Sequence, residues 1–406
     1  MKVFGSHDAN TIEQLELAAP RAVRVALMAD GHKGYYLPVG AVAAYREEIP
    51  VEGVGYDIAC GNCAILTDLI ESDLEDWEWF GLADRIWDEI PHGLGIGNKN
   101  PKSPNKVGHR IFADERWGLL PRGEIRDKLF HKAYDQLGSI GSGNHYVDVF
   151  VDELDRIWVG VHFGSRAFGH SIASGFLALS EGKEWSDRVP GGSGGFVDLN
   201  APMGQDYLEL MGLAGDYAYA GREWVAEYVV KEILGAEEID RVHNHHNFAW
   251  KETDLGEKVY VVRKGATPAF PGQRGFVGGS MGDNSVILEG ADAIRQDDIC
   301  DSYDIQEQQQ DAMFSTVHGA GRVMSRSQAK GKWNRKTGEI YKPGQVSQEM
   351  MDEAVEAAGV IRRGGDLDES PHVYRKLESV LAAQGNTIRV LHTLRPKVVV
   401  MAGRKR

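Results

Sequence analysis

The spacing of apolar and polar positions changes repeatedly along the 406 residues of the chain. Short runs rich in β-branched and aromatic residues, such as VRVALMAD and KVYVVRKGA, predict strands. Longer segments place apolar residues three or four positions apart, which predicts helices with one buried face. Because the two kinds of segment follow one another throughout the sequence, the pattern predicts an α+β fold with interleaved sheets and helices.

Several of the predicted elements have recognisable ends. Asn10 and Thr11, followed by Glu13 and Gln14, resemble a capping box that opens a helix over IEQLELAA. A long helix over residues 206–235 is closed by a glycine. Further helices are predicted over residues 74–90, 123–137, 350–361 and 373–383. Further strands are predicted within 146–164 (a hairpin), 241–250, 258–266 and 398–401, and an exposed loop over 95–110.

The chain contains no sign of a division into parts. No segment repeats with a period of about 20–50 residues, which excludes solenoids and propellers. No proline- or serine-rich linker interrupts the sequence. We therefore expect a single domain over residues 1–406.

Composition narrows the class of protein. The chain is 42% hydrophobic and 26% charged, which is typical of globular proteins. No run approaches the roughly 18 apolar residues of a membrane helix, and MKVFGSHDAN becomes polar too early for a signal peptide. Three cysteines do not suggest a disulfide framework. These features predict a cytoplasmic protein without a membrane segment.

The net charge of −15 argues against a protein coated by nucleic acid, but one segment has the opposite sign. From His318 to Gly338 there is no acidic residue. The basic residues of this segment are Arg322, Arg326, Lys330, Lys332, Arg335 and Lys336. A charge run is usually a solvated face. This one begins at a histidine in the glycine-rich stretch FSTVHGAG, where a ligand could approach the main chain closely.

Polar residues of a second kind stand at the ends of predicted strands, beside small residues. They are Asp57 and Cys60 in GYDIACGN, Asn144 and His145 in GSGNHYVD, His162 in VHFGSR, and His245, His246 and Asn247 in NHHNFAW. A lone histidine is more often a core or surface residue than a ligand. A carboxylate, a thiol and several imidazoles in this arrangement instead favour a site for a borderline divalent metal.

Cys60 and Cys63 also form a Cys-x-x-Cys motif. A zinc ribbon requires a second pair at similar spacing, and the remaining Cys300 is alone. A redox-active dithiol would be expected at the start of a helix. We therefore expect Cys63 to be a buried packing residue.

Two glycine-rich segments could bind an anion. VGGSMGDNS lacks the Lys-[Ser/Thr] ending of a P-loop and is not a GxGxxG motif. Its backbone amides could still form an anion-binding nest. HGAGR adds Arg322, whose guanidinium suits phosphate. Each segment, taken alone, could equally be a tight turn.

Taken in order, LMADGHKG, EGVGYDIACG, GSGNHYVD, VHFGSR, HHNFAW, VRKGAT, GGSMGDNS, STVHGAGRVMSR and DESPHVY resemble the motifs of the RtcB family of RNA ligases. The resemblance covers nearly the whole chain and implies the α+β fold of that family. It also implies a GTP- and manganese-dependent enzyme that joins an RNA 2′,3′-cyclic phosphate or 3′-phosphate end to a 5′-hydroxyl end, in RNA splicing or repair.

The resemblance assigns roles to individual positions. The implied ligands of two manganese ions are Asp57, Cys60, His145, His162 and His246. The implied GTP pocket comprises Asn144, His145, Tyr146, Val147, Asp148, His246, Asn247, Gly278, Gly279, Ser280, Met281, Ser285, His318, Gly319, Ala320, Gly321 and Tyr374. Cys60 is expected to bridge the ions, and His318 to be the guanylated nucleophile. Arg322 is expected to stabilise the phosphate, while Arg166 and the basic segment hold RNA.

The chain also departs from the family pattern. The family usually ends in Val-Lys-Gly, with a lysine at the guanine, whereas Met401 and Ala402 stand near that place and Lys405 follows. The absence of that lysine leads us to expect a weaker preference for GTP over ATP, and Asp148 stands where the family often has a glutamate facing the base. In MADGH, which replaces MPDVH, Asp30 remains a carboxylate that could support a neighbouring site residue.

Other functions fit parts of the same pattern. A metal-dependent cyclic phosphodiesterase acting on RNA ends without ligation would need the metal ligands but not His318. A binding module that senses damaged RNA ends would need neither. The resemblance also raises the expectation of an archease-like activating partner.

Overall fold

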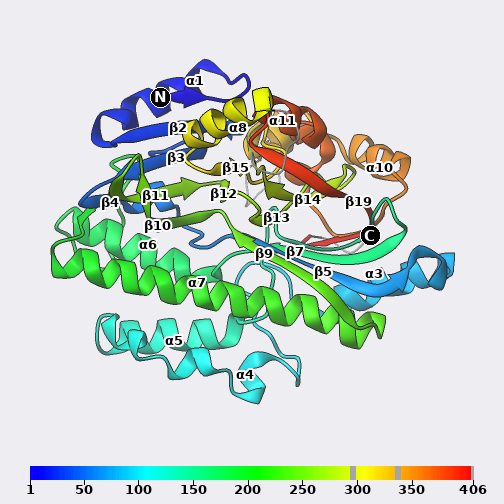
Figure 1. Ribbon diagram of the computed structural model, residues 1–406. Helices are drawn as coiled ribbons and strands as arrows, with labels where there is room; N and C mark the ends of the chain where they lie inside the picture. The colour runs from blue at the N-terminus through cyan, green and yellow to red at the C-terminus, as the bar shows by residue number, and fades with distance from the viewer. Residues whose placement is uncertain (293–298, 334–339, 404–406) are drawn as a thin grey trace.

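The computed structural model describes residues 1–292, 299–333 and 340–403, and its frame is a pair of β-sheets surrounded by helices (Figure 1). The first sheet has the order β1 (Lys2–Val3), β2 (Arg24–His32), β3 (Val39–Tyr45), β11 (Glu257–Lys264) and β10 (Asn247–Asp254). The second sheet has the order β13 (Arg274–Val277), β14 (Ser285–Gly290), β19 (Ile388–Met401), β6 (Tyr146–Val151), β7 (Arg156–Phe163), β5 (Gly61–Ile70) and β9 (Glu238–His245). β18 (Ile361–Arg363) pairs with β19 outside this path. The predicted α+β class is confirmed.

Helices build outward from one face of the second sheet. The long helix α7 (Pro202–Tyr228) packs against β5 and β7, and its last turns, Val229–Leu234, widen into a π-helix. α6 (Arg166–Ser180) packs against α7, and α5 (Glu124–Gln136) packs against α6. α3 (Asp76–Glu89) packs against β18 and β19. No described helix is long and apolar enough to cross a bilayer.

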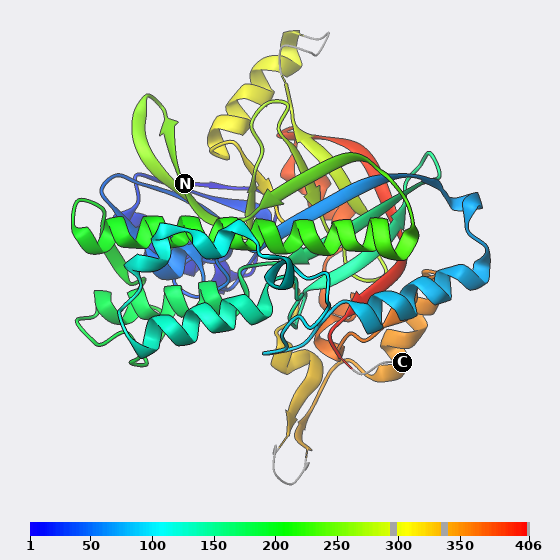
Figure 2. The same cartoon turned by 90° about the horizontal axis from the view of Figure 1, so that it is seen from below.

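Shorter elements complete the described chain. The helices are α1 (Ala9–Ala18), α2 (Val51–Val54), α4 (Pro104–Val107), α8 (Ile299–Asp311), α9 (Arg326–Lys330), α10 (Gln348–Ala357) and α11 (Leu377–Gln384). Paired short strands are β4 (Glu48–Pro50) with β8 (Phe196–Asp198), β12 (Ala266–Pro268) with β15 (Ser315–Val317), and β16 (Gly331–Trp333) with β17 (Ile340–Pro343). Figure 2 shows α8 and the β16–β17 hairpin projecting on opposite sides.

Most elements expected from the apolar pattern are present, with shifts at their ends. The cap of α1 is Asp8, whose side chain accepts a hydrogen bond from the Thr11 amide, rather than Asn10. The predicted exposed loop over 95–110 contains α4 and three buried polar residues, Asn98, Ser103 and Asn105. α6 was not anticipated, and β19 is much longer than the predicted 398–401. Buried polar side chains and small residues conceal periodicity in these segments.

Side chains along β6 alternate between two faces of the second sheet, each of which packs into a different hydrophobic cluster. Val147 and Val149 are fully buried in a cluster with residues of α3 and α7. Tyr146 and Phe150 point to the opposite face, in a cluster that includes residues of β13 and α10. Successive strand residues face opposite sides. Asp148 therefore lies on the same face as Tyr146, away from α7.

At one point the chain passes from one sheet to the other across a single residue. β9 ends the second sheet at His245, and β10 begins the first sheet at Asn247. His246 is the one residue between these strands, and its amide donates to the carbonyl of Cys60 at 2.9 Å. The carbonyl of His246 accepts from Ala266. Any site built at His246 is therefore shared between both sheets.

Candidate functional site

The pairing of β5 with both of its neighbours brings separate motifs to one end of the second sheet. Gly61, the first residue of β5, pairs with Phe163 of β7 on one side and with His245 of β9 on the other. Antiparallel pairing aligns opposite residues closely. Cys60, directly before β5, is consequently held near His162, which directly precedes Phe163.

Only glycine fits at position 61. A Cβ atom there would lie 2.3 Å from the carbonyl oxygen of Asn244 and 2.5 Å from the Cα of His245. Both contacts are with backbone, which cannot move aside without breaking the pairing of β9. Gly61 therefore permits the close approach of strands that brings Cys60 toward the histidines.

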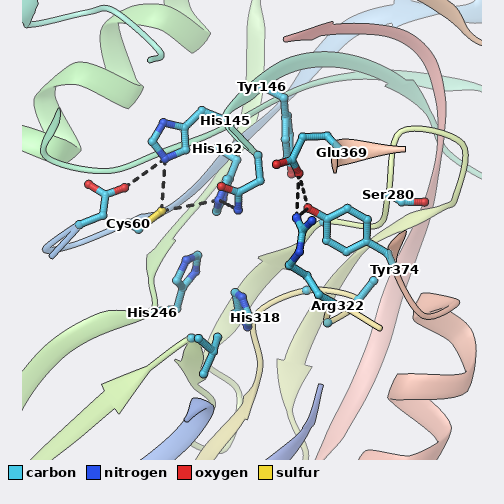
Figure 3. A pocket seen from close by; sticks show the side chains of 18 of the residues that line it. Cys60, His145, Tyr146, His162, His246, Ser280, His318, Arg322, Glu369 and Tyr374 are labelled. Atoms are coloured by element: carbon cyan, nitrogen blue, oxygen red, sulfur yellow. Dashed lines mark hydrogen bonds and ion pairs between the residues drawn. The ribbon is translucent and has the colours of Figure 1, made fainter. Parts of the chain in front are cut away.

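Four other side chains predicted as metal ligands converge on Cys60. Figure 3 shows three of them, His145, His162 and His246. The Cys60 Sγ lies 3.6 Å from Nε2 of His162 and 3.8 Å from Nε2 of His145. The donor atoms form two sets, each within 4.8 Å: Cys60, His162 and His246 in one, and Asp57, Cys60 and His145 in the other. Both sets contain Cys60. The donors present thus fit two borderline divalent ions that share one thiolate.

Further hydrogen bonds orient two of these imidazoles. Nδ1 of His145 donates to the carbonyl oxygen of Ile140 at 2.7 Å. Nδ1 of His162 lies 2.7 Å from Oδ1 of Asn62, a second acceptor. In both rings Nε2 is left facing Cys60. Such partners fix the tautomer and the ring direction that a metal site requires.

The surroundings also favour the ionisation states that bind metal. Burial, followed by the charges of neighbouring histidines, lowers the pKa of His162 and His246 well below the usual value, which keeps these rings neutral. Burial acts to raise the pKa of Asp57, but the hydrogen bond to His145 and nearby positive charge leave it lowered. Burial and the adjacent Asp57 raise the pKa of the Cys60 thiol, which a bound cation would counteract.

His318 follows β15 and is held by a carboxylate from the other end of the chain. Its Nδ1 lies 2.5 Å from Oδ2 of Asp30, on β2. The same oxygen accepts from the backbone amides of His318 and Gly319, at 3.0 and 3.3 Å. Gly321, with a φ of +71°, lies so close that a Cβ there would come within 2.3 Å of the Asp30 carbonyl oxygen. The glycines around His318 therefore let the bend wrap around Asp30.

Asp57, Cys60, His145, His162 and His246 together form a candidate metal-ligand cluster. A cavity of about 380 Å³ opens between this cluster and His318. The predicted pocket residues that line it are Asn144, His145, Tyr146, Asp148, His246, Asn247, Gly278, Gly279, Ser280, Met281, His318, Gly319, Ala320, Gly321 and Tyr374. A backbone bridge between Gly278 and Gly319 places the two glycine-rich segments side by side. The volume is in the range of small-molecule sites.

Two predicted pocket residues do not reach this cavity. Val147 faces the α3–α7 core because β6 alternates between its two faces. Ser285 is buried behind the glycine-rich bend, where its Oγ accepts from the Gly279 amide at 3.0 Å. Ser285 supports the bend, whereas Val147 supports the sheet.

Other lining residues were not assigned from the sequence. Lys264, at the end of β11, is buried in the cavity wall, and its Nζ donates to the carbonyls of Tyr35 and Glu52. Burial lowers the pKa of Lys264 to about 7. Glu369 is a second such residue. Lys264 belongs to the motif VRKGAT and Glu369 to DESPHVY. That their side chains point into the cavity depends on contacts with distant parts of the chain, which the motifs do not indicate.

Three described basic residues of the segment after His318, Arg322, Arg326 and Lys330, form ion pairs with acids from residues 366–369. Arg322 donates to the Tyr374 hydroxyl at 2.9 Å and to the Asp368 carbonyl at 2.6 Å. The Tyr374 hydroxyl donates to Glu369. Lys330 forms an ion pair with Asp368 at 2.6 Å. This network orients Arg322 and Tyr374 at the cavity (Figure 3), and it reduces the positive charge that the sequence suggested.

Arg326 and Arg166 approach the loop that carries Asn144. The Arg166 guanidinium lies beneath Gly141, where a Cβ would come within 1.9 Å of its Nη1. Arg326 lies against Gly143 in the same way, because a Cβ at that position would be 2.9 Å from Nη2 of Arg326. Arg335 and Lys336, which belong to the same basic segment, lie outside the described residues. Arg166 and Arg326 thus place positive charge beside this loop, and Arg326 also forms ion pairs with Asp368 and Glu369 at 3.4 Å.

One end of the cavity carries polar groups without partners. β19 pairs Val399 with Asp148 and Met401 with Tyr146, so the C-terminal strand closes this end. The Tyr146 hydroxyl and Oδ1 of Asp148 have no hydrogen-bond partner among the described residues. Burial raises the pKa of Asp148 well above its usual value. Lys405 lies outside the described residues. A ligand with polar edges would satisfy these two groups.

Comparisons with known proteins agree in their result. The family profile described as tRNA-splicing ligase RtcB matches residues 14–402. The chain is 30% identical over 397 residues to RNA-splicing ligase RtcB of Escherichia coli K12, covering 93% of this chain and 89% of the relative. It is 30% identical over 434 residues to tRNA-splicing ligase RtcB of Pyrobaculum aerophilum, covering 88% and 83%. The similarity extends through every segment that lines the cavity.

The two cysteines near the cavity should respond differently to substitution. Cys60→Ala removes the donor common to both candidate ligand sets and should eliminate measurable metal binding when the metal-free protein is titrated with divalent ions such as manganese. Cys63 is fully buried in the core. Cys63→Ala should reduce the free energy of unfolding by about 1 kcal/mol and leave metal binding intact. Equal loss of binding in both variants would instead indicate a Cys-x-x-Cys site.

Proposed function

Because the chain belongs to the RtcB family of tRNA-splicing ligases and is therefore an RNA ligase, we propose that it works through a guanylated His318. In this proposal it joins an RNA 2′,3′-cyclic phosphate or 3′-phosphate to a 5′-hydroxyl end, in RNA splicing or repair, through an RNA-(3′)pp(5′)G intermediate. The observation that supports it best is His318, held by Asp30 at a cavity that the metal-ligand cluster also lines.

Asp57, Cys60, His145, His162 and His246 would hold two manganese ions. Manganese at this place would neutralise negative charge on the triphosphate and on the RNA phosphate. The shared Cys60 supports a pair of ions rather than one. The neutral state of His162 and His246 further suits metal binding.

The first step of the proposed reaction forms a bond between His318 and GTP. The Asp30 carboxylate lies 2.5 Å from Nδ1 and would favour a proton on that nitrogen, which would leave the lone pair of Nε2 for attack. Nε2 attacks the α-phosphorus, the bond to the β-phosphate oxygen breaks, and pyrophosphate leaves. The carboxylate then stabilises the positive charge of the imidazolium-like product. The adjoining glycine segments leave room for the phosphates beside the backbone.

The later steps transfer GMP and then release it. Water opens a cyclic phosphate, and the resulting RNA 3′-phosphate attacks the phosphorus on His318, taking over GMP. The 5′-hydroxyl of the second RNA end attacks that activated phosphate, and GMP leaves. Arg166 and Arg326, beside the Asn144 loop, are placed to bind the RNA phosphates. An archease-like protein that speeds the guanylation step is a further proposed partner.

A cyclic phosphodiesterase that does not ligate is the alternative function, and nucleotide transfer to His318 separates the two. His318→Ala should fold normally, bind manganese and form no nucleotide adduct when it is incubated with labelled GTP and examined by mass spectrometry. Ligation should cease, whereas opening of the cyclic phosphate should continue. The wild-type adduct should be labile in acid and stable in base, as a phosphorus–nitrogen bond is. Ligation at a wild-type rate in this variant would refute the mechanism.

Asp30 should affect the nucleophile rather than the metal. Asp30→Asn retains an oxygen that can accept from the His318 and Gly319 amides, but it loses the negative charge opposite Nδ1. Guanylation should slow at least about tenfold, corresponding to roughly 1.4 kcal/mol of transition-state stabilisation. Manganese affinity should stay unchanged because Asp30 belongs to neither ligand set. Single-turnover adduct formation and metal titration check these outcomes separately.

Nucleotide preference should depend on Asp148 at the closed end of the cavity. A guanine presents two neighbouring N–H donors, and these would stabilise the ionised carboxylate of Asp148 against the burial that raises its pKa, while adenine presents no such pair. Met401 supplies no polar group to recognise the guanine oxygen. We therefore expect the preference for GTP over ATP to be narrower than in relatives with a lysine there, and Asp148→Asn to narrow it further. Competition between labelled nucleotides for the adduct measures this, and an undiminished GTP preference in the wild type would contradict it.

A further inference from the structure

Arg222 is a fully buried arginine that lies directly behind the candidate metal centre. It is on α7, with 0% of its surface exposed. Among the described residues it forms no ion pair with a carboxylate. A buried charge is normally paired, because removing it from water is unfavourable. Its retention at this position therefore requires an explanation from the groups that it does contact.

One atom of Arg222 connects two segments that carry candidate ligands. Nη1 donates to the carbonyl oxygen of Ala59 at 2.8 Å and to that of Phe163 at 2.7 Å. Ala59 directly precedes Cys60, and Phe163 directly follows His162. The same nitrogen thereby fixes the backbone on both sides of the pair whose Sγ and Nε2 lie 3.6 Å apart.

The backbone on the Cys60 side needs such a restraint. Ala59 has a φ of +55°, in the left-handed region that a residue with a side chain rarely occupies. Its amide donates to the carbonyl of Asn247 at 2.8 Å, and its carbonyl accepts from Arg222. Strained conformations persist when the surroundings hold them from several sides. Arg222 supplies one of the two restraints on this peptide.

The guanidinium is itself held in one orientation. Its Nε donates to Nε2 of His243 at 2.9 Å, and its centre lies 5.0 Å from the ring centroid of Tyr219. Burial and the charge of Arg222 lower the pKa of His243 well below its usual value, so the ring is neutral and can accept. Nδ1 of His243 faces Glu223 at 3.6 Å. The fork of Arg222 is thus fixed before any metal binds.

We propose that Arg222 is a positioning residue for the metal centre, which sets the separation of Cys60 from His162 by holding the carbonyls of Ala59 and Phe163. The proposal rests on the proposed function only in taking this centre to bind manganese. Arg222 touches neither a substrate nor a metal in this role. Its planar guanidinium reaches both carbonyls and His243 together, which the single ammonium group of a lysine cannot do.

The test compares Arg222→Lys with a matched substitution of another buried arginine. Arg263 is also fully buried, but it forms an ion pair with Glu252 and donates to Ser315 and the Met313 carbonyl. Manganese titration of the metal-free proteins should show about 10–100-fold weaker binding in Arg222→Lys. Arg263→Lys should lower the thermal unfolding midpoint and leave the manganese affinity unchanged.

A spectroscopic readout separates geometry from general loosening. Cobalt(II) bound to a site with a thiolate gives a charge-transfer band, and its visible bands depend on the coordination geometry. These bands should shift or weaken in Arg222→Lys and match the wild type in Arg263→Lys. Should Arg222→Lys fail to fold, His243→Leu removes the acceptor that fixes Nε and should weaken manganese binding severalfold.

Three outcomes would overturn the inference. The first is a folded Arg222→Lys protein with the manganese affinity and cobalt spectrum of the wild type. The second applies if Arg222→Lys does not fold, and it is a His243→Leu protein with wild-type manganese affinity. The third is an equal loss in Arg263→Lys, which would mean that any buried arginine has this effect. If the wild-type protein itself bound no manganese, there would be no metal centre to position, and the proposed function would be contradicted as well. A difference between the Arg222 and Arg263 variants tests only the role of Arg222.

Discussion

The close pairing of β5 between β7 and β9 is the constraint on which the metal-ligand cluster depends. Gly61 pairs with both neighbours at once, and a side chain there would overlap the backbone of Asn244 and His245. This register places the residues just outside the strands, including Cys60, within reach of one another. Because a slip of one residue turns every side chain of a strand to the other face, the cluster exists only in this register. Its geometry is therefore a property of the second sheet as a whole.

The proposed nucleophile, His318, depends on the first sheet in the same way. Asp30 belongs to β2 and holds both the ring and the backbone amide of His318, which follows β15. The sheets meet at His246, whose ring centroid lies 4.8 Å from that of His318. The proposed transfer chemistry requires phosphate to lie between the metal ligands and the nucleophile. The junction thus brings together two parts of the site, each of which is supported by a different sheet.

The sequence predicts elements and motifs better than it predicts contacts between them. Strand ends carrying Asp57, Cys60 and the histidines are visible as motifs, and the alternation in YVDVFV already indicates that Val147 and Asp148 face opposite sides. By contrast, α6 and the full length of β19 are hidden, because their apolar positions are interrupted by small or polar residues. Lys264, Glu369 and Arg222 could not be placed from the sequence. Their direction depends on partners far away along the chain, and no local pattern specifies those partners.

The arrangement of charge around the cavity follows from the same long-range contacts. A protein with a net charge of −15 must attract a polyanion locally, yet the Arg322 and Lys330 side chains are bound to groups between residues 368 and 374. These acids weaken the attraction at a distance, but they also hold Arg322 in one direction at the cavity wall. Groups that are already oriented need no reorganisation when charge develops during a reaction. The acids of DESPHVY and its neighbours therefore reduce the long-range attraction for RNA. In return they fix the geometry of the cationic side chains close to His318, where the proposed bond to phosphorus forms.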